Sequence, residues 1–148
     1  MSADVIRLVM PAKSEYLILA RLALAGIARE TPIGESALAD LKLAVTEACG
    51  NAVRHAYAGE AGVVEVRFAV APGSIEIEVR DDGGLQDAAA LPETPTDGMP
   101  AESGMGLAII EAVVDELEVV ARSDGERGTL VRMTKRLETE TPAQRRRD

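Results

Sequence analysis

The sequence lacks the surplus of positive charge that a nucleic-acid-binding surface needs. Its 16 Lys and Arg residues are outnumbered by 25 Asp and Glu residues, which leaves a formal net charge of −9. Binding to a phosphate backbone depends on a basic patch, so we expect no direct contact with nucleic acid. The single basic run is RRR at residues 145–147, in a segment that is typical of a solvated tail.

Internal disulfides and membrane spans are also missing. Cys49 is the only cysteine, and no apolar run approaches the roughly 20 residues that cross a bilayer. The start, MSADVIRL, has no apolar core of the kind found in secretory signals. We therefore expect a cytoplasmic protein with no membrane partner. His55 is the only histidine, and without a Cys/His pair or an HExxH motif it does not support a zinc site.

What remains is enough apolar sequence for one domain. The chain has 148 residues, of which 47% are hydrophobic, so a single core fits and a second domain does not. We expect a compact domain over residues 1–137 and a disordered tail over residues 138–148.

The apolar periodicity predicts an α+β fold, a two-layer α/β sandwich in which helices cover one face of a mixed sheet. Ser14 and Ser36 are the expected caps of the first two helices, and the second helix should reach about residue 57. Strands are expected at residues 5–10, 63–70, 74–79, 117–122 and 129–134, and a third helix at residues 107–114. Residues 81–103 have no periodicity, so a mobile lid is expected there.

A polar stripe interrupts the second helix, in the stretch EACGNAVRHAY at residues 47–57. Glu47, Asn51 and Arg54 or His55 follow one another at helical spacing and share one face. An ordinary solvent-exposed face is one interpretation. However, Asn is a poor residue for a helix interior, and its amide oxygen suits a phosphate-bound Mg²⁺. Glu47, one turn earlier, has the chemistry of a general base for a hydroxyl group.

Two glycine-containing stretches follow. In VRDDGG, Asp81 ends a predicted strand, where it is either a turn residue or an acceptor for an exocyclic amine such as that of adenine. Gly83 would let a base approach the backbone. In SGMGL, Gly104 and Gly106 stand at a predicted helix start, where free N–H groups favour phosphate.

Taken in order, these three stretches resemble the motifs of the GHKL (Bergerat) ATPases, and specifically of the anti-sigma factor serine/threonine kinases. The resemblance covers residues 5–137. It implies that Asn51 binds Mg²⁺, that Glu47 is the general base, and that Asp81 reads adenine with Gly83 making room. It also implies a phosphate site at the second glycine stretch and a supporting hydroxyl on the last hairpin. The nucleotide-binding residues implied in this way are Asn51, Arg54, His55, Asp81, Gly83, Gly104, Met105, Gly106, Leu107 and Thr129.

The same resemblance implies a function. Such a protein binds ATP with Mg²⁺ and phosphorylates a STAS-type anti-anti-sigma factor. It holds a sigma factor until the unphosphorylated antagonist displaces it, and so regulates transcription by partner switching. The family also implies a homodimer, and a sigma contact through the first helix that includes Arg21.

Two departures from the family pattern keep an alternative open. Leu85 stands where a second spaced glycine is expected, and no Lys or Arg occurs between Asp81 and Ala121. Arg54 is our hypothesis for the missing phosphate-binding cation. The alternative is a catalytically weak or inactive ATP-binding module that sequesters a sigma factor or another protein. A histidine kinase fragment is disfavoured, because no helix pair with a phosphoacceptor histidine precedes the domain.

Overall fold

The structure is a computed structural model that describes residues 4–56, 62–81, 102–121 and 128–137. Residues 82–101 of the predicted lid, which include Gly83 and Leu85, and the predicted tail at residues 138–148 lie outside these residues, whereas the two ends of the predicted lid belong to a strand and a helix. The side chains of His55 and Met105 are likewise outside the described part, although both residues lie within helices.

Five strands form one sheet in the order β1-β2-β3-β5-β4. Every neighbouring pair among them is antiparallel. The predicted mixed sheet is therefore wrong in this detail. The helix between β3 and β4 does return the chain so that both strands run the same way, but β5 inserts between them and separates the parallel pair. The strands are β1 Asp4–Pro11, β2 Val63–Ala71, β3 Ser74–Asp81, β4 Glu116–Ala121 and β5 Thr129–Arg136.

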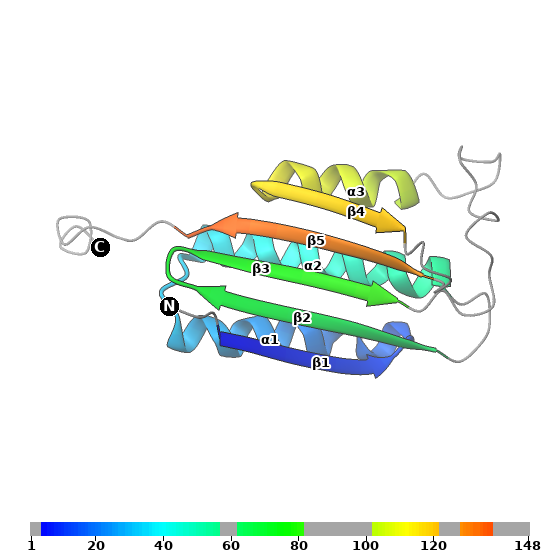
Figure 1. Ribbon diagram of the computed structural model, residues 1–148, viewed down its shortest axis with the longest axis horizontal. Helices are drawn as coiled ribbons and strands as arrows, with labels where there is room; N and C mark the ends of the chain where they lie inside the picture. Colours follow the sequence, from blue (N-terminus) through cyan, green and yellow to red (C-terminus); the bar gives the residue numbers. More distant parts are fainter. Residues whose placement is uncertain (1–3, 57–61, 82–101, 122–127, 138–148) are drawn as a thin grey trace, which may run out of the picture.

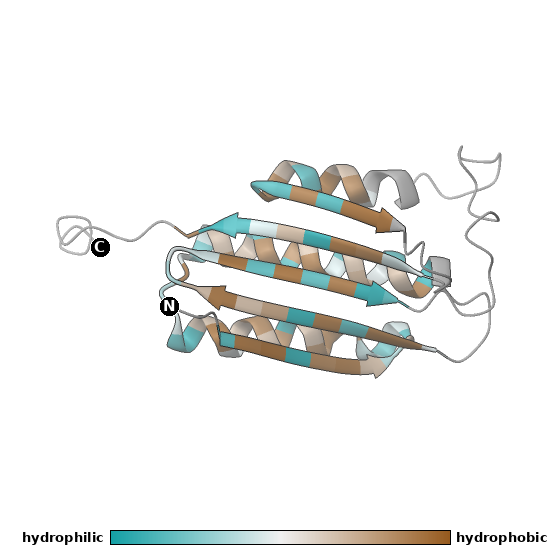
Figure 2. Ribbon diagram, viewed as in Figure 1, coloured by the Kyte–Doolittle hydropathy of each residue, from teal (hydrophilic) through white to brown (hydrophobic). Residues whose placement is uncertain are grey.

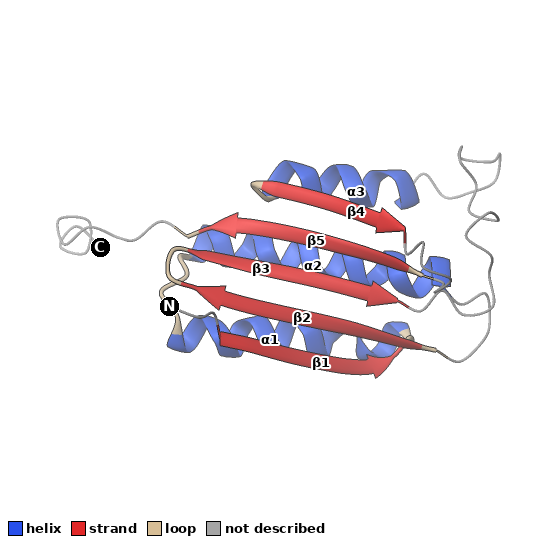
Figure 3. Ribbon diagram, viewed as in Figure 1, coloured by secondary structure: helices blue, strands red, loops and turns tan. Residues whose placement is uncertain are grey.

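All the α-helices of the described chain lie on one face of this sheet (Figures 1 and 3). The α+β two-layer fold predicted from the sequence is thereby confirmed. The helices are α1 Leu17–Glu30, α2 Glu35–Ala56 and α3 Glu102–Val113, and a single 3-10 turn, η1 Ser14–Tyr16, precedes α1. Within the described residues, no helix is both long enough and apolar enough to cross a membrane.

The predicted helix caps are wrong. No side-chain hydrogen bond caps η1 or α1, because the chain enters α1 through the 3-10 turn that contains Ser14. The helix α2 begins before Ser36, and the carbonyl of Gly34 accepts the backbone N–H of Leu38 at 2.9 Å. Ser36 is therefore inside the first turn, where its side chain has no capping role.

The core lies between the sheet and α2. Alternate residues of the central strands point inward, and Phe68, Ile75 and Ile77 are fully buried. The facing side of α2 is built largely from small side chains, which let the helix approach the sheet closely. These buried α2 residues are Leu41, Ala44, Val45, Ala48, Cys49 and Ala52. Burial raises the pKa of the Cys49 thiol to about 12, as expected for a core cysteine.

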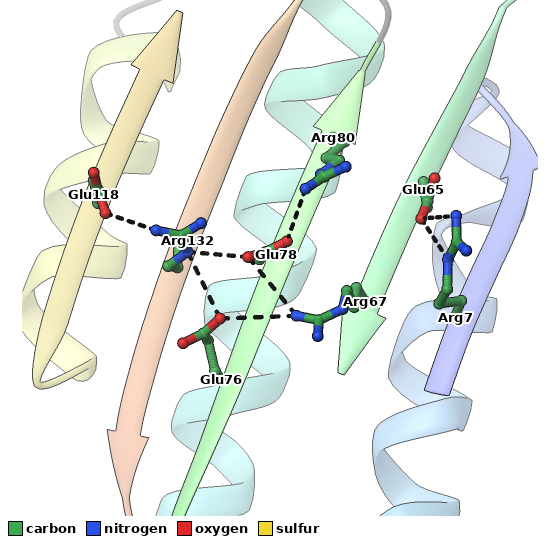
Figure 4. Close-up of polar contacts among 8 residues, drawn as sticks. All are labelled: Arg7, Glu65, Arg67, Glu76, Glu78, Arg80, Glu118 and Arg132. Carbon is green, nitrogen blue, oxygen red and sulfur yellow. Dashed lines mark hydrogen bonds and ion pairs between the residues drawn. The ribbon is translucent and has the colours of Figure 1, made fainter. Parts of the chain in front are cut away.

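Along β3, apolar residues that face the helices alternate with charged residues on the opposite face of the sheet, as the colours in Figure 2 show. Glu78 is only 4% exposed and accepts Arg132 Nε at 3.0 Å and Arg80 Nη2 at 3.4 Å. Its hydrogen bond raises the pKa of Arg132. We call these side chains the charge ladder; they come from all five strands and form two groups (Figure 4), the pair Arg7–Glu65 and a network of Arg67, Glu76, Glu78, Arg80, Glu118 and Arg132.

Candidate nucleotide site

The polar stripe of α2 is not an ordinary solvent face. Asn51 is only 8% exposed, whereas Glu47 is half-buried and Arg54 is exposed. Arg54 Nη2 donates a hydrogen bond to Asn51 Oδ1 at 2.7 Å. This bond uses one of the two acceptor positions of the amide oxygen and leaves the second for another ligand.

Gly106 of α3 lies directly against this stripe. A Cβ atom placed on Gly106 would be 3.0 Å from Asn51 Nδ2, 3.2 Å from Asn51 Oδ1 and 3.2 Å from Glu47 Oε2. Such distances are shorter than normal van der Waals contacts, so a side chain at Gly106 would displace the two polar groups or the helix. The absence of a side chain therefore allows the glycine stretch of α3 to reach Glu47 and Asn51, which joins two of the three motifs.

The third motif is tied to the last hairpin. Asp81 ends β3 and is 7% exposed. Its Oδ1 accepts a hydrogen bond from the backbone N–H of Thr129 at 3.3 Å. Thr129 begins β5 just after Gly128, whose φ of 122° suits glycine. The contact runs through the backbone of Thr129, and the role expected of its hydroxyl stays a prediction.

These pieces gather at one end of the molecule. Figure 1 shows the end of β3, the beginning of β5, the end of α2 and the beginning of α3 at the same end of the sheet. Leu107 lies one residue further along α3 and is 36% exposed. The predicted start of the third helix at residue 107 is wrong: α3 begins at Glu102, so Gly104 and Gly106 lie inside its first two turns. Arg21 lies elsewhere, exposed on α1 next to the exposed Leu22.

The groups at this end are chemically suited to a nucleotide and a divalent cation. Asn51 and Glu47 offer oxygen ligands, the kind that Mg²⁺ prefers. Asp81 offers a buried carboxylate, which is an acceptor for an amino group on a base. Gly106 leaves open the volume that a Cβ would fill between the polar groups. The residues present therefore fit ATP with Mg²⁺.

One residue at the far end of α3 was not singled out by the sequence. Lys135 of β5 donates to the carbonyl of Val113 at 2.7 Å and to Asp40 Oδ2 at 3.1 Å. An isolated lysine in a strand gives no local signal, and its acidic partner is 95 residues away.

Comparison with known protein families identifies the family of this chain. The model of the histidine kinase-like ATPase domain matches residues 10–135. The chain belongs to this family. The match includes all the predicted site residues, from Arg21 to Thr129.

Within the histidine kinase-like ATPases, the chain is similar to serine-protein kinases. The serine-protein kinase RsbW of Bacillus pumilus is 40% identical over 94% of this chain and 90% of its own length. The RsbW of Bacillus subtilis is 37% identical over 94% of this chain and 89% of its own length. The family predicted from the three motifs is thus confirmed, and within it the chain groups with serine kinases.

Solved structures of histidine kinase-like ATPases agree with the fold. The RsbU and RsbW domains of Rv1364c from Mycobacterium tuberculosis match with a TM-score of 0.68 at 25% identity. That match covers 93% of this chain, which spans about 35% of the longer protein. The histidine kinase domain of the Erythrobacter litoralis blue-light-activated kinase EL346 shares the fold, with a TM-score of 0.51 at 24% identity over 93% of this chain and 64% of that chain.

Proposed function

We propose that this protein binds ATP with Mg²⁺ and phosphorylates a serine or threonine of a STAS-type anti-anti-sigma factor. The observation that carries the proposal is the contact of Gly106 with Glu47 and Asn51. It brings a glycine-rich helix start, an amide oxygen and a carboxylate to one point, and phosphoryl transfer needs this combination of phosphate-binding, metal-binding and proton-accepting groups. The family relationship to serine-protein kinases supports the same reaction.

Each side chain at that point has a distinct task. Asn51 would hold Mg²⁺, which supplies charge neutralisation on the phosphates when bound. Glu47 would accept the proton of the attacking hydroxyl and orient its oxygen. The backbone N–H of Gly104, in the first turn of α3, would contact the phosphates, and Met105, Gly106 and Leu107, further along the helix, would line the same site.

Asp81 would bind the exocyclic amine of adenine. The Thr129 N–H fixes the orientation of this carboxylate, which prepares it to accept a directed hydrogen bond. Gly83 would leave room for the base next to the backbone. The hydroxyl of Thr129 would support the same pocket.

Arg54 would supply the cation that the sequence between Asp81 and Ala121 lacks. Its guanidinium already reaches the Asn51 amide, so the phosphates would lie within the reach of this flexible side chain. His55, the next residue of α2, would line the same site. If Arg54→Ala left both ATP affinity and turnover unchanged, this role would have to be abandoned.

The protein would act as a cytoplasmic anti-sigma factor and as a homodimer. Exposed apolar side chains on α1 and β1 support this, because Ile18, Leu22 and Val9 are each more than half exposed. Arg21 lies next to Leu22 on α1 and would contact the sigma factor. Phosphorylation of the antagonist would add charge and weaken its docking, leaving the sigma factor bound.

A second candidate is a binding module that holds its partners but transfers no phosphate. The absence of Lys and Arg between Asp81 and Ala121 favours it. Two measurements separate the candidates: calorimetry of ATP and ADP binding with and without Mg²⁺, and transfer of the γ-phosphate to a purified STAS-type protein. Binding with transfer supports the kinase, binding without transfer supports the module, and the absence of binding refutes both as ATP-dependent proteins.

A further inference from the structure

The helix α3 is fastened to α2 at its C-terminal end by Lys135. The ammonium group donates to the carbonyl of Val113, the last residue of α3, at 2.7 Å. It also pairs with Asp40 of α2 at 3.1 Å, and the two side chains are 17% and 34% exposed. A cation at a helix C-terminus satisfies a carbonyl that has no partner within the helix and lies at the negative end of the helix dipole.

A second contact between the same helices lies at the candidate site. Asp40 precedes Glu47 by seven residues on α2, and Gly106 precedes Val113 by seven residues on α3. At 1.5 Å per residue, the two contacts are about 10 Å apart along either helix. Because Asp40 is near Val113 and Glu47 is near Gly106, the helices run antiparallel, with equal spacing between their two points of contact.

The hydrogen bond from Lys135 to Asp40 links the end of α3 to α2, whereas other hydrogen bonds link the same end to the sheet. Just after α3, the N–H of Asp115 donates to the carbonyl of Thr134 at 2.9 Å, and Asp115 Oδ2 accepts the N–H of Arg136 at 2.6 Å. These bonds fix the end of α3 to β5 without involving Lys135. What Lys135 adds is the link from this end to Asp40.

We propose that Lys135 is a positioning residue of the nucleotide site. By holding Val113 level with Asp40, it sets the axial register of α3 against α2, and so keeps Gly106 level with Glu47 and Asn51. A shift along the axis would move Gly106 out of this contact and bring towards it residues of the same helix face one turn away, such as Ile109 and Ile110, whose side chains are larger than the Cβ that already lies within 3.0–3.2 Å of the polar groups. The effect on catalysis rests on the proposed function, whereas the register itself is a property of the nucleotide-free protein.

The test compares Lys135→Met with Lys42→Met, a control that removes the same charge from α2. Nuclear magnetic resonance of the nucleotide-free protein would follow the backbone amide of Gly106 and the side-chain amide of Asn51. Calorimetry would give the ATP dissociation constant. We expect Lys135→Met to move both signals and to weaken ATP binding about tenfold, whereas Lys42→Met does neither. Lys135→Arg should restore the wild-type signals, because it keeps a cation at the same place.

Unchanged Gly106 and Asn51 signals in Lys135→Met would overturn the proposal, even if the variant melted at a lower temperature. Should that variant not fold, Asp40→Asn decides the question, since it weakens the tie to α2 and leaves the bond to Val113 in place. Unmoved signals in Asp40→Asn would then overturn the proposal. If the wild-type protein bound no ATP, the proposed function would fail, while the resonance measurements would still decide the register.

Discussion

Asp81 and Thr129 meet at the end of the sheet although 48 residues separate them, and the backbone N–H of Thr129 donates to Asp81 Oδ1 at 3.3 Å. The carboxylate is thereby held on the buried side of the strand end, where its acceptor atoms have a fixed direction. A carboxylate oriented in this way can distinguish ligands by the direction of the hydrogen bond that it accepts.

The first prediction concerns Asp81→Asn. The amide keeps the size of the side chain but replaces one acceptor oxygen with a donor, so an amino group on the ligand meets a donor. We expect calorimetry to show ATP and ADP binding weakened by at least about tenfold, as for the loss of a charged hydrogen bond. Asp4→Asn, at the exposed start of β1, is the matched control and should bind as wild type. Equal affinity in both variants would remove Asp81 from the site.

The second prediction separates binding from chemistry at Glu47. Glu47→Gln keeps the shape that Gly106 contacts but cannot accept a proton. We expect ATP affinity within about twofold of wild type and phosphotransfer slowed by roughly 10²–10⁴-fold, the usual contribution of a general base. The control is Glu111→Gln on the exposed side of α3. Normal transfer by Glu47→Gln would show that another group takes the proton.

The third prediction compares two glycines within helices. Gly26→Ala in α1 adds a methyl group with nothing within 4 Å, so it should stabilise the protein by about 0.5–1 kcal/mol through helix propensity. Gly106→Ala has the same propensity gain, but its methyl group would lie 3.0 Å from Asn51 Nδ2. We expect Gly106→Ala to lose that gain in denaturant unfolding and to weaken ATP binding. Equal stabilisation by both substitutions would contradict the close helix contact.

The fourth prediction concerns alkaline pH and Cys49. Burial raises the pKa of the folded thiol to about 12 from its ordinary value of 9.0, so the unfolded chain gives up this proton first as pH rises. The stabilisation from the neutral buried thiol is therefore complete below about pH 9 and is lost between about pH 9 and 12. Denaturant unfolding of Cys49→Ala should show a shallower fall in stability over this range than the wild type. In the folded wild type, iodoacetamide should react slowly at pH 8.

The sequence predicted the parts of the site that depend on neighbours in the chain. The spacing of Glu47 and Asn51 on one helix and the place of Asp81 at a strand end follow from local periodicity, and the structure has them there. The order of the strands does not follow from local periodicity. The predicted mixed sheet failed because β5 pairs with β3 and keeps β4 away from it, a choice made by tertiary packing.

Long-range polar contacts escaped prediction for the same reason. Lys135 and Asp40 are ordinary charged residues in their own segments, and only the fold brings them within 3.1 Å. The helix starts were predicted wrongly because Ser14 and Ser36 are favourable caps in isolation. In the structure, however, Ser14 lies within η1, and at the start of α2 the carbonyl of Gly34 accepts the N–H of Leu38.

The charge ladder affects which surfaces of this protein a partner can bind. Stacking another surface on the part of the sheet around Glu78 would remove water from arginines and glutamates that already pair with one another. A partner would lose less hydration by docking on the exposed apolar side chains of α1, such as Ile18 and Leu22. The partner switching proposed above would benefit from a broad face that binds neither partner, because both would then compete for the same limited surface.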